Sequence, residues 1–166
     1  MPKLKRIPRP IGDAALVVVV CLVAYTVAAA LWGSTLPTLG VRVLSDMSLE
    51  RVPGTEDARF VGFGRAILAT SAIAFLVAMW AFATRMRSFL MMLWLGIVTG
   101  FGSLWFVVFG NIIARATHPE PTAHPQPGQT IEALTPIGLS SGLLLAPTFA
   151  LLFYWVAASF ISDNKF

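Results

Sequence analysis

Four long stretches of the chain are almost purely apolar, and polar segments separate them. They run over residues 13–33, 64–84, 88–114 and 137–161. A helix needs about 20 mostly apolar residues to cross the hydrocarbon core of a membrane, and each stretch is long enough. The pattern predicts an all-α, polytopic membrane protein whose four transmembrane helices form a single domain over residues 1–166.

Composition strengthens this prediction. Hydrophobic residues make up 57% of the chain and charged residues 12%, whereas an ordinary soluble domain has about 25% charged residues. Two longer polar segments, residues 34–63 and 115–136, lie between the apolar stretches. Within the first, VRVL (41–44) is expected to form a short strand or to lie on the membrane surface. The prolines of the second predict an extended, semi-rigid spacer.

Basic residues gather at the ends of the apolar stretches. The positive-inside rule then places both termini and the 85–87 link in the cytoplasm, and both long loops outside. We expect a multi-pass protein of the bacterial plasma membrane. The net charge of +4 is interpreted as a topology signal, not as a nucleic-acid surface. The residues expected to contact anionic phospholipid headgroups are Lys3, Lys5, Arg6, Arg9, Arg85 and Arg87.

The first stretch also has features of a signal peptide. A basic leader precedes it, and Ala28, Ala29 and Ala30 resemble a cleavage site. Its apolar core is longer than the usual 7–15 residues. We therefore expect an uncleaved first helix, in which Cys21 is a small buried apolar residue and Asp13 caps the helix N-terminus.

Glycines are concentrated in the third stretch, which contains LGIVTGFGSLWFVVFG (95–110). Small residues let helix backbones approach closely in a membrane, where little hydrophobic force brings helices together. The bundle's own helices and a partner subunit are both possible neighbours. The predicted helix-packing residues are Gly96, Gly100, Gly102, Gly138 and Gly142. Pro147 is expected to kink the fourth helix.

Chemistry-bearing residues are scarce within the four stretches. Pumps and coupled transporters need ionisable groups at bilayer depth, and membrane haem needs histidines on helices. The metal-like residues His118, Glu120 and His124 lie in the proline-rich spacer, where an extended backbone spreads them apart. No catalytic, cofactor or metal site is predicted, and we expect the chain not to be an enzyme.

Three features together carry a family resemblance: LWGSTLP (31–37), GTEDARF (54–60) and the glycine-rich third stretch. The chain resembles a family of small actinobacterial integral membrane proteins of unknown function. The resemblance implies a membrane location and a four-helix fold. By analogy, it suggests an accessory subunit of a respiratory supercomplex that joins a cytochrome bc reductase to a terminal oxidase.

Three functions stay open at this point. The first is a non-catalytic accessory or scaffold subunit that binds larger membrane subunits. The second is a small transporter or lipid-handling protein that acts as a homo-oligomer, and the third is an assembly factor. A transporter needs a polar cavity, and its candidate lining residues are Thr70, Ser71, Thr99, Ser103, Ser140 and Ser141.

Overall fold

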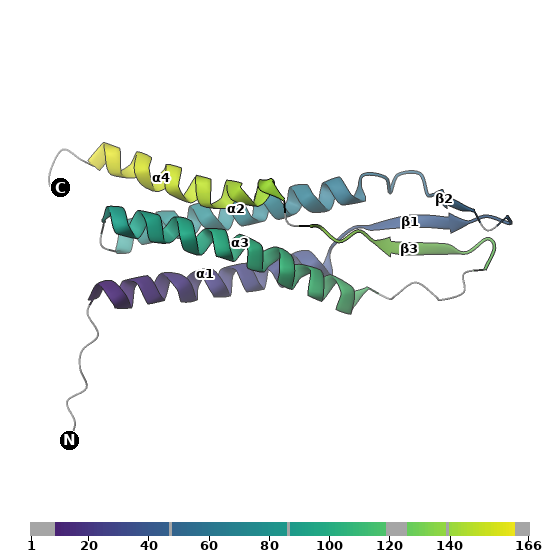
Figure 1. Cartoon of the computed structure of the whole chain (residues 1–166), viewed down its shortest axis with the longest axis horizontal. Coiled ribbons are helices and arrows are strands. Elements are labelled where there is room, and N and C mark those ends of the chain that lie inside the picture. Colours follow the sequence, from purple (N-terminus) through teal and green to yellow (C-terminus); the bar gives the residue numbers. More distant parts are fainter. Residues whose placement is uncertain (1–8, 47, 86, 119–125, 139, 162–166) are drawn as a thin grey trace, which may run out of the picture.

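Four helices run side by side along the long axis of the molecule in the computed structural model (Figure 1). They are α1 (Arg9–Ser34), α2 (Ala58–Thr84), α3 (Phe89–Thr117) and α4 (Leu145–Ile161). The structure describes residues 9–46, 48–85, 87–118, 126–138 and 140–161. The prediction of four helices long and apolar enough to cross a membrane is confirmed.

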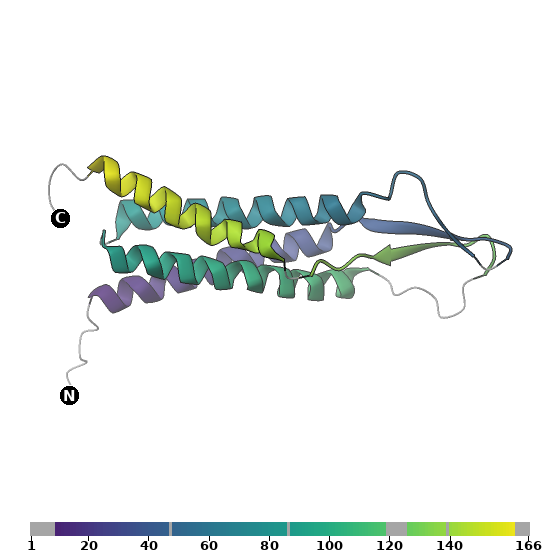
Figure 2. The ribbon, with the colours of Figure 1, turned by 45° about the horizontal axis from the view of Figure 1, so that its top comes forward.

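The helices meet at two distinct ends. At one end lie the start of α1, the end of α2, the start of α3 and the end of α4, and we call it the link end because residues 85–88 join α2 to α3 there. At the other end a small β-sheet extends beyond the helices, and we call it the sheet end. Both views place the sheet at this end (Figure 2).

The sheet corrects the all-α prediction. Its strands are β1 (Thr38–Val43), β2 (Leu49–Arg51) and β3 (Thr130–Leu134), in the order β2-β1-β3 with both pairings antiparallel. The strand expected within residues 41–44 is confirmed, because Val41–Val43 belong to β1. Strand β3 was not predicted, and it turns part of the expected spacer into ordered structure.

Where β1 pairs with β3, one face of the sheet is apolar and the other is mostly polar; in β2, Arg51 lies on the same side as Val41. Val41 of β1 lies opposite Ile131 of β3, whereas Arg42 lies opposite Glu50 of β2. The alternation of side chains along a strand produces this separation. In the β1–β2 turn, the hydroxyl and the backbone N–H of Ser48 both donate to Asp46, and these hydrogen bonds lower the pKa of that carboxyl group.

The start of α4 differs from the prediction. The helix begins at Leu145 after a 3₁₀ turn, η1 (Ser141–Leu144), so Pro147 lies in its first turn. A proline in the first turn of an α-helix costs little, because the regular i→i−4 bonds begin only after that turn. Pro147 therefore does not lie in the helix interior, where the kink was predicted. Proline has no N–H to donate to the carbonyl of Leu143, four residues earlier. That carbonyl instead accepts a hydrogen bond from the Ser103 hydroxyl of α3 at 3.3 Å.

Two aromatic residues of α1 hold α1, α2 and α3 together. A Cβ placed on Gly102 of α3 would lie 2.5 Å from the Tyr25 ring, and one on Gly110 would lie 2.5 Å from the Trp32 ring. The same two side chains donate to α2: Tyr25 Oη to the Thr70 carbonyl at 3.2 Å, and Trp32 Nε1 to the Gly62 carbonyl at 3.0 Å. Each aromatic residue therefore joins three helices.

The backbones of α1 and α3 approach most closely at Gly33. A Cβ placed there would overlap the carbonyl oxygen of Gly110. Helices α2 and α4 use alanines for the same purpose, with Ala74 and Ala78 packed on Ala146 and Ala150. Small residues thus set the distance between both pairs of helices.

Replacement of Gly33 by alanine should weaken the bundle. The added methyl group forces α1 and α3 apart, and we expect a loss of about 1–3 kcal/mol in the free energy of unfolding. Gly64 is the matched control, because a Cβ added to this helical glycine of α2 would have no described atom within 4 Å. Gly64→Ala should be neutral or stabilise by up to about 1 kcal/mol. Unfolding by SDS titration, followed by circular dichroism, measures both variants, and equal stabilities would contradict the close packing at Gly33.

Candidate functional site

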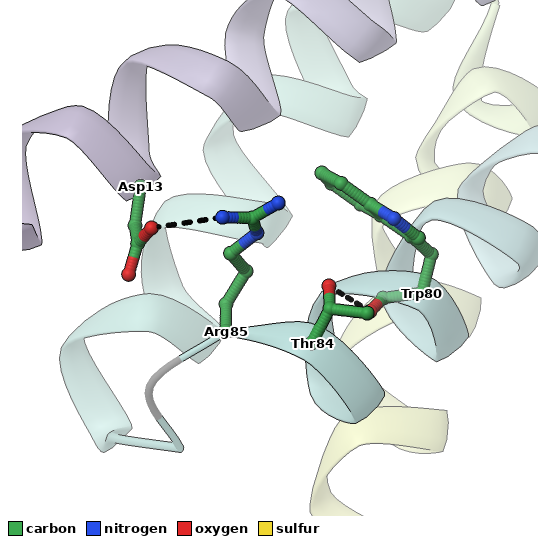
Figure 3. Close-up of polar contacts among 4 residues, drawn as sticks. All are labelled: Asp13, Trp80, Thr84 and Arg85. Carbon is green, nitrogen blue, oxygen red and sulfur yellow. Dashed lines mark hydrogen bonds and ion pairs between the residues drawn. The ribbon is translucent and has the colours of Figure 1, made fainter.

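The polar side chains of the link end form an ion pair between α1 and the end of α2. Asp13 accepts from Arg85 at 3.1 Å, and the two side chains are 20% and 24% exposed. The Arg85 guanidinium lies 4.9 Å from the centre of the Trp80 ring, on the other side from Asp13 (Figure 3). Nearby, the Thr84 hydroxyl donates to the Trp80 carbonyl at 2.7 Å. A cation held between a carboxylate and an aromatic face ties α1 to α2.

One of the two predictions for these residues needs revision. Asp13 is not a cap, because α1 begins at Arg9 and Asp13 lies a turn inside the helix. Its carboxylate instead accepts the Arg85 hydrogen bond. Arg85 has this internal partner, and its Nε is buried without a hydrogen-bond partner in the described part of the chain. Its contact with lipid headgroups stays a prediction.

A second group of contacts at the link end joins α2, α3 and α4. Arg87 donates from Nε to the Phe82 carbonyl at 3.2 Å, and its guanidinium lies 4.7 Å from the centre of the Phe82 ring. That ring packs edge-on against Tyr154, at 5.1 Å between centroids. The backbone N–H of Ser88 donates to the Tyr154 hydroxyl at 3.3 Å, and the Ser88 hydroxyl caps α3 by accepting from Met91. The short link is thereby fixed to α4.

The other predicted headgroup contacts cannot be placed. Lys3, Lys5 and Arg6 lie outside the described residues, and so does the side chain of Arg9, although its backbone begins α1. Their contacts with anionic lipid remain predictions.

The predicted packing glycines of α3 face two different helices. Gly96 lies against Leu151 of α4, whose side chain would be 3.0 Å from an added Cβ, and Gly100 lies near Pro147 at 3.8 Å. Gly102 instead faces α1 through the Tyr25 ring. The third helix is therefore in contact with neighbours on both sides.

The two glycines before α4 behave differently from each other. Gly142 in η1 is packed on α2, and a Cβ there would lie 2.6 Å from Ile67. Gly138 has no described atom within 4 Å of that position. It precedes η1 in a non-helical segment, so the expected helix packing at Gly138 is not observed. Nearby, the Asn111 amide of α3 exchanges two hydrogen bonds with the backbone of Ile137 and holds this segment.

The roles of Gly33, Tyr25 and Trp32 were not predicted from the sequence. A signal exists in hindsight. Tyr25 and Trp32 are seven residues apart on α1, and the α3 glycines that they contact, Gly102 and Gly110, are eight apart. Both spacings correspond to about two turns of a helix. Two aromatic residues on one helix can therefore face two glycines on a helix packed beside it.

Three buried hydroxyl groups of the described spans bond to backbone carbonyls. Thr70 donates to the Ala66 carbonyl at 2.9 Å and Thr99 to the Leu95 carbonyl at 2.7 Å. The Ser103 hydroxyl lies 2.8 Å from the Gly100 carbonyl. These three residues are at most 1% exposed.

The remaining residues proposed to line a polar cavity differ from one another in their surroundings. The Ser71 hydroxyl is buried without a partner among the described residues, and Ser140 is exposed. The Ser141 side chain lies outside the described part of the chain. Ser103 and Ser140 both line one groove between α3 and α4, whose other lining residues are mostly apolar.

The residues considered for a metal site, His118, Glu120 and His124, lie in a segment that the structure describes only in part. His118 Nδ1 lies 2.9 Å from the Ala114 carbonyl, while Glu120 and His124 lie outside the described residues. Among the residues that the structure describes, no group of three or more His, Cys, Asp or Glu side chains is placed to hold a metal ion.

Grooves on the surface of the described bundle are mostly apolar. Two of them, of about 530 Å³ and about 560 Å³, follow the seam between α1 and α3. The indole of Trp94 donates across this seam to the Ala14 carbonyl at 3.1 Å, and that of Trp105 to the Thr26 hydroxyl at 2.9 Å. A third groove, of about 340 Å³, lies between α3 and α4.

Comparison with protein-family models, curated proteins and solved structures finds no match to this chain. The resemblance to an actinobacterial family therefore stays a prediction, and the function is inferred from the geometry.

The Asp13–Arg85 pair can be tested by a double-mutant cycle. Asp13→Asn and Arg85→Gln should each destabilise the bundle, and the double variant should lose less than the sum. We expect a coupling free energy of about 1 kcal/mol, because the two groups touch and are partly removed from water. Raising the salt concentration should reduce the coupling. Unfolding in detergent measures all four proteins, and strictly additive losses would show that the pair contributes nothing.

Proposed function

We propose that the chain is a non-catalytic accessory or scaffold subunit of a larger bacterial membrane complex. One observation carries the proposal. The hydroxyl groups of Thr70, Thr99 and Ser103 and the polar heads of Tyr25 and Trp32 all bond to protein backbone. The bonds of Tyr25 and Trp32 join α1 to α2, and groups engaged in this way are not free to bind a solute or move a proton.

The sheet supports a docking role outside the membrane. The order β2-β1-β3 leaves one side of β2 and one side of β3 without a neighbouring strand in the described part. An edge strand presents backbone N–H and C=O groups to which an added strand can bind. Leu49 on β2 is also 66% exposed, so a large apolar side chain stands at this edge.

The proposed setting follows from the sequence. The link end faces the cytoplasm, as its basic residues suggest, and the sheet faces the outside, where it meets an extracytoplasmic domain of a larger subunit. A respiratory supercomplex of reductase and oxidase is the assembly that we propose to search first.

The alternative is a lipid-handling homo-oligomer. The apolar grooves along the α1–α3 seam favour lipid over a polar solute. The alternative differs from the subunit proposal in its partner, because it needs only further copies of the same chain.

Purification of a tagged chain from native membranes in mild detergent tests the proposal. We expect larger subunits at a fixed stoichiometry by native mass spectrometry. A photo-crosslinking amino acid at Leu49 should attach to one of these subunits. Leu68, a similarly exposed leucine in the α2 span, is the matched position for lipid-facing background.

Three results would contradict the subunit proposal. A monomer without partners would remove it, and a homo-oligomer with Leu49 crosslinked only to other copies would support the alternative. Recovery with incomplete complexes only would identify an assembly factor.

A further inference from the structure

The two grooves of the α1–α3 seam form one continuous apolar channel on the surface. Both are lined by Trp94 and Ile97, so one leads into the other. The α1 wall follows a single helical stripe, as the three- and four-residue spacing shows. Its lining residues are Pro10, Asp13, Ala14, Val18, Cys21 and Leu22.

One part of the channel is a slot with a tryptophan at each end. Cys21 and Val98 form its floor and are 2% and 9% exposed. Val18 on one wall is 38% exposed and Phe101 on the other is 70% exposed. The indole rings of Trp94 and Trp105 mark the two ends, and each is fixed to α1 by its hydrogen bond.

The length of the slot matches one leaflet of a membrane. Trp94 and Trp105 are separated by three helical turns, which is about 16 Å at about 1.5 Å per residue. Half of a hydrocarbon core of about 30 Å is about 15 Å. A single acyl chain of a lipid has this extent.

The link end of the channel is polar and carries excess positive charge. Asp13 and Ser88 line the groove there, and Arg85 neutralises Asp13. Arg87 directly precedes Ser88 and is exposed, and its guanidinium lies over the Phe82 ring. Asp13, Arg85 and Arg87 together leave one positive charge among the described residues of this end. An anionic headgroup complements this end, because cations near a membrane surface attract anionic lipid.

We propose that the α1–α3 seam is a binding site for one anionic phospholipid of the link-end leaflet. An acyl chain lies in the slot between Trp94 and Trp105, and the phosphate lies at the level of Arg87 and Ser88. The site goes beyond the scaffold role and does not depend on it, since it needs only that the four helices cross a membrane.

A side chain that fills the slot should displace the lipid. Val18→Trp places an indole in the slot, and Val156→Trp on α4 is the control, because Val156 is 37% exposed and Val18 is 38% exposed. Native mass spectrometry of protein from phosphatidylglycerol nanodiscs should show one retained lipid for the wild type and Val156→Trp. The lipid-bound fraction should fall at least tenfold for Val18→Trp. Equal retention by the two variants would overturn the proposal.

A second measurement needs no variant in the slot. Phosphatidylglycerol with a photoreactive group on its acyl chain should attach to the wild type at residues 18–22 or 97–105. Attachment spread evenly over all four helices, or confined to α2 and α4, would overturn the site. A protein subunit crosslinked into the seam, with no lipid retained, would also overturn it while leaving the scaffold proposal intact.

The headgroup preference tests the charged end separately. Arg87→Gln should reduce the ratio of phosphatidylglycerol to phosphatidylcholine bound in a competition by several-fold. Arg115→Gln, at the sheet end of α3, should leave the ratio unchanged. An unchanged ratio for Arg87→Gln would remove Arg87 from the site.

Discussion

The architecture depends on two aromatic rings that lie on glycine backbone. Tyr25 and Trp32 of α1 can reach the carbonyls of α2 only because Gly102 and Gly110 of α3 leave room for their rings. In hydrocarbon, such close packing replaces the hydrophobic force that assembles soluble cores. The cost of helical glycine is offset because each ring gains contact with α3 and its polar head gains an acceptor on α2. The α1–α2–α3 arrangement therefore follows from a few positions.

This packing also determines which surfaces stay available for function. The polar heads of Tyr25 and Trp32 and the hydroxyl groups of Thr70, Thr99 and Ser103 have backbone partners within the described spans, so we expect other molecules to bind at the exterior. Two exterior features differ from a uniform lipid-facing surface. One is the α1–α3 channel, which begins beside the Asp13–Arg85 pair, and the other is the three-stranded sheet.

The sequence predicted the spans well, because hydrophobic length is a local property. It did not predict contacts between distant positions. Asp13 and Arg85 are 72 residues apart, and only the fold shows that their charges meet. Strand β3 pairs with β1, from which α2 and α3 separate it in the sequence, so the TIEAL segment had no local sign of its partner. For the same reason the sequence predicted that the glycines of α3 pack against other helices. It could not show that Gly33 of α1 lies against Gly110.

The junction between α1 and β1 has a mechanical consequence. Only Thr35, Leu36 and Pro37 lie between the helix and the strand, Leu36 is buried, and proline restricts the backbone at the joint. Strand β1 also forms the centre of the sheet, and the Asn111–Ile137 bonds secure the chain that follows β3. We therefore expect the helix and the sheet to move together as one rigid body. A small tilt of α1 in the membrane would be magnified as a sideways displacement at the β1–β2 turn.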